Sequence, residues 1–425
     1  MSAGPQMASP ELEVPPPLAR EGERALAVAV GTPVEEIRLR EVAGGIKLEL
    51  APARSLRLDA EGRWITARIG PWMLRRRVDG GIVFARSDAS LTGQTGGDIV
   101  ARDAPPDSSW HRVVATLAAS LRARLRHAAP EAIEEPPGVP AEGRTRRLAR
   151  ADALLARAEA LGPPEFLALS REFDRVYAEP VPILPPDRYR DLVVLPATGC
   201  PHADCTFCAW YQDATFRAFD GPTLETHLDR LEAFFGEGLR ARDGLFLGSA
   251  SAFSVSDERL LLLLERVEAR FGAFPRGAAG FLDPHHAPGR DEAAWRSLRQ
   301  AGVALVVVGL ETAHAPLRER LGKPGDLSEL GRNVQALRQA GIAAGITVLT
   351  GASRPEEEEA HRRETVAYLA SLGLTRRDRV YLSPWDRAPD PAAALREAEA
   401  IGRALGQVSP VTRSTYALNR YRFYA

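Results

Sequence analysis

The sequence DLVVLPATGCPHADCTFC, from Asp191 to Cys208, places a run of apolar residues directly before all three cysteines of the chain. The run is short and ends at a proline, which is typical of a strand buried on both faces of a sheet. The cysteines follow with the spacing C-x4-C-x2-C. Three thiols this close together indicate a metal or cluster site rather than unrelated core cysteines.

Five more apolar runs of the same kind follow, separated by amphipathic stretches. They begin near residues 244, 278, 303, 345 and 379. Two of the intervening stretches end at Gly272 and Gly341, the residue type that favours the left-handed cap of a helix. Apolar strands alternating with helices predict a parallel sheet. Six β/α units are fewer than the eight of a complete barrel. We therefore predict an α/β fold with a partial (β/α)6 barrel over 186–390, while an open, doubly wound sheet would show the same periodicity.

The region before the barrel has a different pattern of apolar and polar residues. Residues 1–22 are rich in proline and predict a disordered tail without a signal peptide. Residues 23–130 contain alternating segments such as RWITARI and PWMLRRRV, separated by turn signals. They predict a small α+β N-terminal domain with an antiparallel sheet. Residues 131–185 indicate a linker followed by helices, and residues 391–425 a C-terminal extension.

The composition excludes several classes of protein. The chain has 425 residues, a formal net charge of −1, 45% hydrophobic residues and 26% charged residues. This balance is that of a soluble globular protein with no specific nucleic-acid signal. No apolar run approaches the roughly 18 residues that would span a membrane. Three cysteines are too few for a disulfide framework, so we predict a cytoplasmic protein.

Two kinds of metal centre suit the cysteine loop. Three thiolates can bind three irons of a [4Fe–4S] cluster and leave the fourth iron open to another ligand. Alternatively, the loop could bind zinc, with His202 or water as the fourth ligand, although structural zinc ligands more often come as two separated pairs. The protein would then be a zinc-binding structural or regulatory protein.

A cysteine loop after the first strand of a partial barrel resembles the radical S-adenosylmethionine (radical SAM) enzymes. Their common motif is C-x3-C-x2-C with an aromatic residue before the last cysteine, and Phe207 occupies that position here. The first gap is one residue longer in this chain, as in branches of the superfamily whose loops are of this longer kind. The resemblance covers roughly 191–384.

The resemblance implies cofactors and a reaction. Cys200, Cys205 and Cys208 would bind a [4Fe–4S] cluster whose open iron chelates S-adenosylmethionine. Reductive cleavage would generate a 5′-deoxyadenosyl radical that abstracts hydrogen from a substrate, and the residues point to no particular substrate. An electron donor of the flavodoxin or ferredoxin type is implied as a partner. A further alternative keeps the barrel and the cluster but uses the cofactor for sensing or methyl transfer.

The resemblance also implies further cofactor contacts at the ends of the strands. Small residues in LGSASAF let the backbone approach the cofactor, the GLET turn would handle its hydroxyls or carboxylate, and TVLTGAS would line its adenine. The side chains and backbone positions implied to bind the cofactor are Phe207, Gly248, Ser249, Ala250, Glu311 and Lys323.

Three residues are candidates for substrate contact or proton transfer. Asp283 and His285 lie in FLDPHH at the end of the third strand, and Tyr211 follows the last cysteine. Loops at strand ends commonly carry such groups. Each residue could instead be an ordinary surface or packing residue.

Overall fold

The computed structural model describes most of the chain. The described residues are 37–42, 44–50, 54–86, 102–127, 133–134, 143–177, 181, 184–211, 214–286, 289–323 and 326–415. The predictions for the tail 1–22, for most of the linker and for the last ten residues of the C-terminal extension lie outside this range. The chain divides into two compact units. The N-terminal unit comprises Met1–Val176, Glu232–Ala241 and Phe423–Ala425, and the barrel unit comprises Tyr177–Leu231 and Arg242–Arg422.

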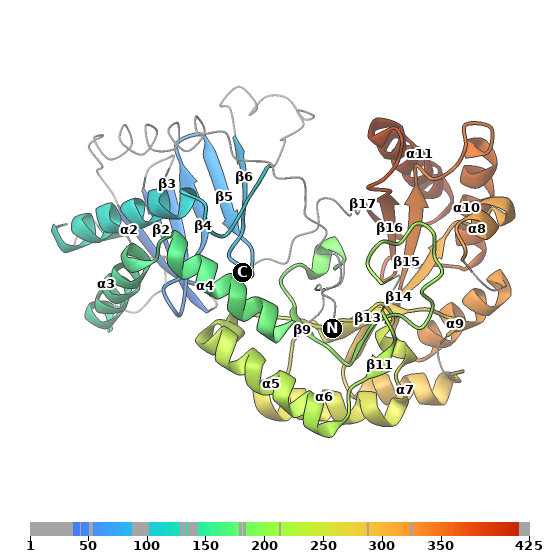
Figure 1. The fold of residues 1–425 in the computed structure, drawn as a ribbon, viewed down its shortest axis with the longest axis horizontal. Helices are drawn as coiled ribbons and strands as arrows, with labels where there is room; N and C mark the ends of the chain where they lie inside the picture. The colour runs from blue at the N-terminus through green and yellow to red at the C-terminus, as the bar shows by residue number, and fades with distance from the viewer. Residues whose placement is uncertain are drawn as a thin grey trace. The chain divides into compact units, whose positions relative to one another are not determined.

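The N-terminal unit contains an eight-stranded sheet in the order β7-β6-β5-β4-β3-β2-β1-β8 (Figure 1). Its strands are β1 Ile37–Val42, β2 Gly45–Leu50, β3 Arg54–Asp59, β4 Trp64–Ile69, β5 Trp72–Arg76, β6 Ile82–Arg86, β7 Arg102–Ala104 and β8 Ile133–Glu134. All neighbours are antiparallel except β1 and β8. The helices are α2 Trp110–His127, α3 Arg144–Ala160 and α4 Pro163–Val176. The predicted antiparallel sheet is therefore confirmed.

The alternating sequence of this sheet buries one face against the helices. Leu56, Trp64 and Leu74 alternate with more exposed residues and are nearly inaccessible. They share one apolar cluster with Trp110 of α2 and Leu155 of α3. Burial of this face supplies the driving force for the unit, at roughly 25 cal/mol per Å² of apolar surface.

The barrel unit contains a parallel sheet of seven strands in the order β17-β16-β15-β14-β13-β12-β9. The strands are β9 Leu192–Val194, β12 Leu245–Leu247, β13 Ala278–Leu282, β14 Val303–Glu311, β15 Ala343–Thr350, β16 Arg379–Pro384 and β17 Thr412–Thr415. The six predicted strands are all present, and β17 adds a seventh at the edge beside β16.

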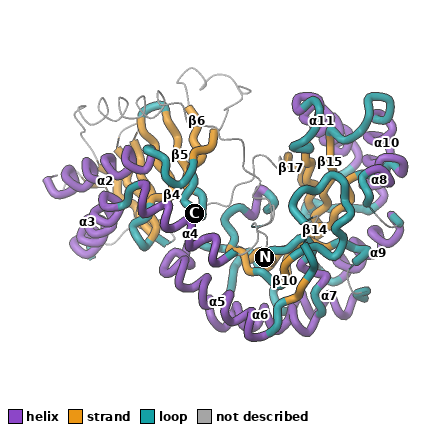
Figure 2. The backbone as a smooth tube through the Cα atoms, viewed as in Figure 1, coloured by secondary structure: helices purple, strands orange, loops and turns teal. Residues whose placement is uncertain are grey.

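Helices follow the strands and lie along one side of the parallel sheet (Figures 1 and 2). They are α5 Gly221–Phe235, α6 Asp257–Phe271, α7 Glu292–Gln300, α8 Ala315–Arg320, α9 Leu327–Gln339, α10 Glu358–Ser371 and α11 Pro391–Val408. Gly272 and Gly341 follow α6 and α9 with φ of 81° and 80°, so both predicted helix ends are confirmed. None of the helices in the described residues combines the length and apolar character that crossing a bilayer requires.

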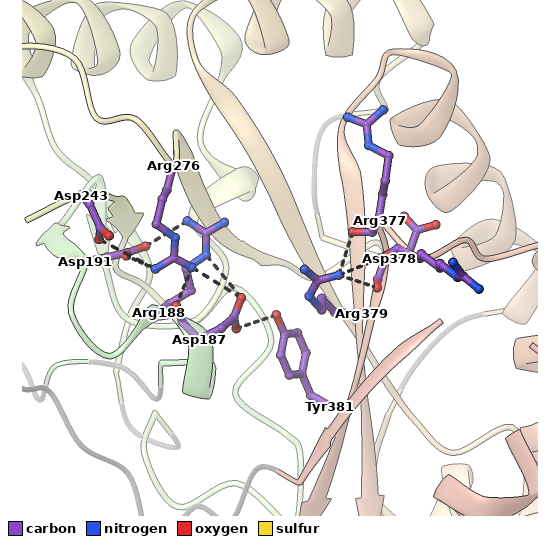
Figure 3. Close-up of polar contacts among 10 residues, drawn as sticks. Asp187, Arg188, Asp191, Asp243, Arg276, Arg377, Asp378, Arg379 and Tyr381 are labelled. Atoms are coloured by element: carbon purple, nitrogen blue, oxygen red, sulfur yellow. Dashed lines mark hydrogen bonds and ion pairs between the residues drawn. The ribbon is translucent and has the colours of Figure 1, made fainter. Parts of the chain in front are cut away.

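A buried polar network joins strands far apart in the sheet at their amino ends (Figure 3). Asp191, directly before β9, is fully buried and accepts hydrogen bonds from Arg188 at 3.0 Å and from Arg276 at 3.4 Å. Tyr381 of β16 donates to Asp187 at 3.0 Å. The segment before β9 is thereby tied both to β13, which Arg276 precedes, and to β16. We call these five residues the base network.

Candidate active site at the carboxyl ends of the strands

The carboxyl ends of the parallel strands surround a cavity of about 180 Å³. Strand ends on this side of a parallel α/β sheet are where active sites are built. Its lining includes three thiols and three charged side chains, namely Cys200, Cys205, Cys208, Asp283, Glu311 and Lys323. The cysteine loop predicted from sequence and the charges predicted at the ends of β13 and β14 therefore meet at one place.

A short hairpin fixes the start of the cysteine loop. β10 Ala197–Thr198 pairs with β11 Arg217–Ala218. The backbone of Cys200 forms a further, isolated β-bridge with the backbone of Thr215. Gly199 lies between them with φ of 71°. A Cβ at this position would lie 2.3 Å from the carbonyl oxygen of Thr215, so only glycine fits.

The turn that follows α8 supports the middle of the cysteine loop. The backbone N–H of Thr206 donates to the carbonyl of Leu321 at 3.0 Å, and its hydroxyl donates to the carbonyl of Arg320 at 3.1 Å. Gly322 lies so close to the loop that a Cβ would be 2.6 Å from the carbonyl oxygen of Asp204. The cysteines therefore depend on a turn more than 110 residues away in sequence.

Phe207 closes one side of the cavity. Its carbonyl oxygen accepts hydrogen bonds from the indole N–H of Trp385 at 3.2 Å and from Arg387 at 2.7 Å. Its ring packs on an apolar cluster that includes Leu317 and Leu349. The aromatic residue that the motif places before the last cysteine therefore lines the cavity beside the thiols.

The burial and the shared cavity of the thiols fit an iron–sulfur cluster. Burial raises the pKa of Cys205 to about 12, and burial also raises the pKa of Cys200. A thiolate at either position therefore needs a nearby positive charge, which a bound metal supplies. Within the described residues, no three His, Cys, Asp or Glu side chains converge on one metal-ion position. In a four-iron cluster each thiolate binds a different iron, so three thiols that face a shared cavity fit that group.

Lys323 is partly buried and lines the cavity together with Asp283 and Glu311. Burial acts to lower the pKa of Lys323, but Asp283 and Glu311 outweigh it, and the pKa is raised. Burial raises the pKa of Glu311. Burial also acts to raise the pKa of Asp283, but the charge of Lys323 and the hydrogen bond from the backbone of His285 outweigh it, so the pKa of Asp283 is lowered. A Cβ at Gly309 would lie 3.0 Å from the Lys323 nitrogen and 2.8 Å from a Glu311 oxygen, so this glycine makes room for both.

The backbone of Glu311 is strained. Its φ of 61° is the sole positive value at a non-glycine residue in the described part of the chain. The N–H of Thr312 donates to the carbonyl of Leu310 at 2.8 Å, which closes a three-residue γ-turn centred on Glu311. Such strain costs about 1–3 kcal/mol and is characteristic of functional sites. The turn leaves the Glu311 carboxylate hydrogen-bonded to Thr347 at 3.0 Å.

Asp283 is held by the loop after β12. Its N–H donates to the buried hydroxyl of Ser251 at 2.8 Å, and its carboxylate accepts from the backbone N–H of His285 at 3.1 Å. The other carboxylate oxygen lies 3.2 Å from His286, whose ring stacks on His202 with centroids 4.8 Å apart. The carboxylate is therefore fixed in direction toward the cavity.

Two of the three proposed catalytic candidates line the cavity and one does not. Asp283 and Tyr211 line it. His285 is not among the lining residues. One of its ring nitrogens lies 2.9 Å from Glu329 and the other lies 3.2 Å from Arg318. Since Arg318 can only donate, the nitrogen facing it accepts and the other carries the proton toward Glu329. His285 is thus placed to hold Arg318 rather than to touch a ligand.

The turn after β12 faces the cavity through fewer residues than the sequence predicts. Ala250 lines the cavity, whereas Gly248 and Ser249 are not among its lining residues. The N–H of Gly248 already donates to the carbonyl of Val194 at 2.8 Å.

His202, the proposed fourth zinc ligand, has a ring nitrogen 2.8 Å from the carbonyl oxygen of Gly322.

Several residues that shape the site carry no motif in the sequence. Arg318, Ser251 and His361 are buried and hold the strand-end turns through the backbone or through hydroxyl groups. Lys323 had a compositional signal, because the chain contains two lysines among 55 basic residues and the other is Lys47 of the N-terminal sheet. In this arginine-rich chain, the lysine in the turn after α8 supplies a compact charge where a guanidinium would be larger.

Comparisons with known proteins agree with this geometry. Residues 194–369 match the family model described as the Radical SAM superfamily. No curated protein sequence matches the chain.

Three similar solved structures illustrate the extent of the likeness. TsrM, a radical S-adenosylmethionine methyltransferase from Kitasatospora setae, is 20% identical with a TM-score of 0.34, over 45% of this chain and 36% of that one. Methylornithine synthase (PylB) is 13% identical with a TM-score of 0.39, over 69% and 74%. Coproporphyrinogen III oxidase (HemN) from Escherichia coli is 15% identical with a TM-score of 0.38, over 52% and 54%. The match thus spans about a third of the TsrM chain.

The fold and the position of the thiols define an α/β domain whose candidate site lies at the carboxyl ends of its strands. The family model then assigns the domain. Residues 194–369, about two fifths of the chain, form a radical SAM domain. The superfamily is named for S-adenosylmethionine, and two similar structures are described as TsrM with a [4Fe–4S] cluster bound and Streptococcus suis SuiB bound to S-adenosylmethionine.

Proposed function

We propose that the chain uses Cys200, Cys205 and Cys208 to bind the cluster and cleaves S-adenosylmethionine reductively to act on a further substrate. The observation that carries the proposal is the convergence of three thiols, two carboxylates and a partly buried lysine on one cavity. When bound and reduced, the cluster supplies one electron that splits the sulfonium into methionine and a 5′-deoxyadenosyl radical. That radical would abstract a hydrogen atom from the substrate and leave as 5′-deoxyadenosine.

The cavity residues bind and orient the cosubstrate in this proposal. The Lys323 ammonium pairs with its carboxylate, because a buried cation next to an anion is worth more than the same pair in water. Glu311 accepts hydrogen bonds from its hydroxyl groups, and the backbone at Ala250 approaches its amino group. Phe207 packs against it and keeps water out, which a reactive radical requires.

Asp283 and Tyr211 are the groups of the cavity lining that we propose to contact the substrate. Asp283 is fixed by Ser251 and accepts hydrogen bonds, so it suits a donor group on the substrate. A one-electron carrier of the flavodoxin or ferredoxin type supplies the electron in this scheme, and we place the enzyme in the cytoplasm, where such carriers and reduced thiols occur.

The test is anaerobic purification followed by reconstitution with iron and sulfide. We expect a brown protein with about four irons and four sulfides per chain, which forms 5′-deoxyadenosine from S-adenosylmethionine when dithionite is added. Reactions without dithionite or without the cosubstrate should give none. A colourless protein that retains one zinc and no sulfide would refute the proposal and favour a zinc-binding role of the cysteine loop.

A further inference from the structure

The strained turn at Glu311 is held from one side by a buried arginine. Arg318 of α8 donates to the carbonyl of Leu310 at 2.8 Å and to the carbonyl of Thr312 at 3.4 Å. These carbonyls flank Glu311, so the guanidinium fixes the backbone on both sides of the positive φ. Because a γ-turn of this kind is unfavourable by itself, the turn persists only while its surroundings hold it.

A fully buried histidine holds the same turn from the other side. His361 of α10 is 0% exposed, and its Nδ1 lies 2.7 Å from the hydroxyl of Thr312. That hydroxyl also accepts the backbone N–H of His314 at 2.9 Å. Since the threonine oxygen receives this N–H, its own hydrogen is available to His361, and Nδ1 acts as the acceptor. Burial lowers the pKa of His361 to about 4, which keeps the ring neutral and able to accept.

The other edge of His361 faces the loop after β15. Its Nε2 lies 3.8 Å from the Glu397 carboxylate of α11. Glu397 is itself buried and accepts hydrogen bonds from the backbone N–H of Gly351 and from the hydroxyl of Ser353 at 2.8 Å. His361 therefore lies between the turn after β14 and the loop after β15, both of which we assign to cofactor binding.

We propose that His361 is a positioning residue, which holds the Thr312 hydroxyl and so keeps the Glu311 carboxylate aimed into the cavity. The proposal rests on the proposed function, since Glu311 is taken there as a contact of S-adenosylmethionine. The alternative is that His361 is an ordinary buried core residue, whose loss weakens the fold without altering the turn.

His111 provides a matched control for this distinction. It is also 0% exposed, and burial lowers the pKa of His111 to about 3. Its ring accepts from the indole of Trp64 at 3.1 Å and stacks on Phe166 within the N-terminal unit. Its role is structural, so a substitution there reports the effect of losing a buried histidine that touches no strand-end turn.

The experiment compares four variants in the full chain, namely His361→Leu, His361→Asn, Thr312→Val and His111→Leu. Asparagine keeps an acceptor near the Nδ1 position, and valine removes only the hydroxyl. One readout is the amide exchange of the peptide over 310–316, which needs no cofactor. The other is the KM for S-adenosylmethionine in 5′-deoxyadenosine formation, normalised to iron content.

We expect His361→Leu and Thr312→Val to speed exchange of this peptide and to raise the KM, each by about tenfold, the loss of one hydrogen bond. His361→Leu also removes the 3.3 Å contact between Nδ1 and the hydroxyl of Thr365. The double variant should therefore be no worse than His361→Leu alone, because the bond that valine removes is already lost. His361→Asn should recover most of the effect, and His111→Leu should change neither readout.

Two outcomes separate failure of this proposal from failure of the proposed function. If His361→Leu lowers the melting temperature but leaves both the peptide exchange and the KM unchanged, His361 is a core residue only. Thr312→Val supplies the same test if His361→Leu does not fold. If the exchange effect appears but the wild-type protein forms no 5′-deoxyadenosine, the positioning of the turn stands and the cofactor assignment fails.

Discussion

The two ends of the parallel sheet both bury charged side chains, but they use them differently. At the amino ends, the charges of the base network are paired with one another or with backbone, as between Asp191, Arg188 and Arg276 (Figure 3). At the carboxyl ends, Glu311 and Lys323 line a cavity, and Glu311 is held in a strained turn. Charges that are fully paired in protein stabilise a geometry, whereas charges aimed into a cavity are available to a ligand. The comparison therefore separates the structural end of the sheet from the chemical end.

The largest effect is expected from removing a thiol at the carboxyl end. Cys205→Ala should lower 5′-deoxyadenosine formation by at least about 100-fold, because a cluster that loses one of three protein ligands is not retained. Iron and sulfide content should fall with the activity, while the melting temperature of the apoprotein should stay near that of the wild type. A variant that keeps a full, reducible cluster would contradict the assignment of Cys205 as a ligand.

The second largest effect is expected from Lys323, which lines the cavity at the carboxyl ends of the strands. Lys323→Met should weaken S-adenosylmethionine binding by roughly 10- to 100-fold, since a hydrogen bond to a charged group is worth about 1.5–3 kcal/mol. Calorimetric titration of the reconstituted protein measures this, with cluster content unchanged. The control is Lys47→Met on the N-terminal sheet, which should bind normally. Equal affinities for the two variants would mean that Lys323 does not contact the cosubstrate.

The base network should instead change the dependence of stability on pH. Burial raises the pKa of Asp191 from 3.8 to about 6, despite the opposing effect of Arg188 and Arg276. Because the folded state binds the proton more tightly, this group favours folding below pH 3.8 and loses that contribution as the pH rises through about 6. From this group alone, the protein should be about 1.4 kcal/mol less stable near pH 7.5 than near pH 5.

Asp191→Asn should remove that part of the pH dependence without altering cofactor binding. Urea unfolding of the full chain at both pH values measures the difference. Asp229→Asn is the control, because its carboxylate is about two-thirds exposed and pairs with Arg270 outside the network. If the wild type and Asp191→Asn have the same pH profile, Asp191 does not titrate in the folded state as proposed.

The smallest effect is expected from Tyr381→Phe, which removes one hydrogen bond from the base network. The Asp187 carboxylate that loses its donor is one-third exposed and lies near Arg188 and Arg276. The cost should be about 1 kcal/mol of unfolding free energy, or roughly 2–4 °C in melting temperature. A clear loss of S-adenosylmethionine affinity in this variant would show that the two ends of the sheet are coupled.

Much of the barrel unit could be predicted from the sequence because its signals are local. Each of the six apolar runs became a buried strand, and helix ends at glycine were confirmed with positive φ. Strand ends of a parallel sheet share one edge, so the order of the strands in the sequence was enough to place the cysteine loop, Asp283 and Glu311 together. The strand β17 and the pairing of β8 with β1 were missed, since such short segments carry no distinct periodicity.

The sequence by itself determined which thiols and carboxylates meet at the cavity, because three cysteines after a buried strand and charged residues at strand ends are recognisable from order and spacing alone. Only the tertiary structure decided how these groups are held. His361 meets Thr312 across 49 residues of sequence, and Arg276 meets Asp191 across 85. Such contacts depend on where each helix packs against the sheet and on the rotamers that packing allows, and neither leaves a repeating pattern in the chain.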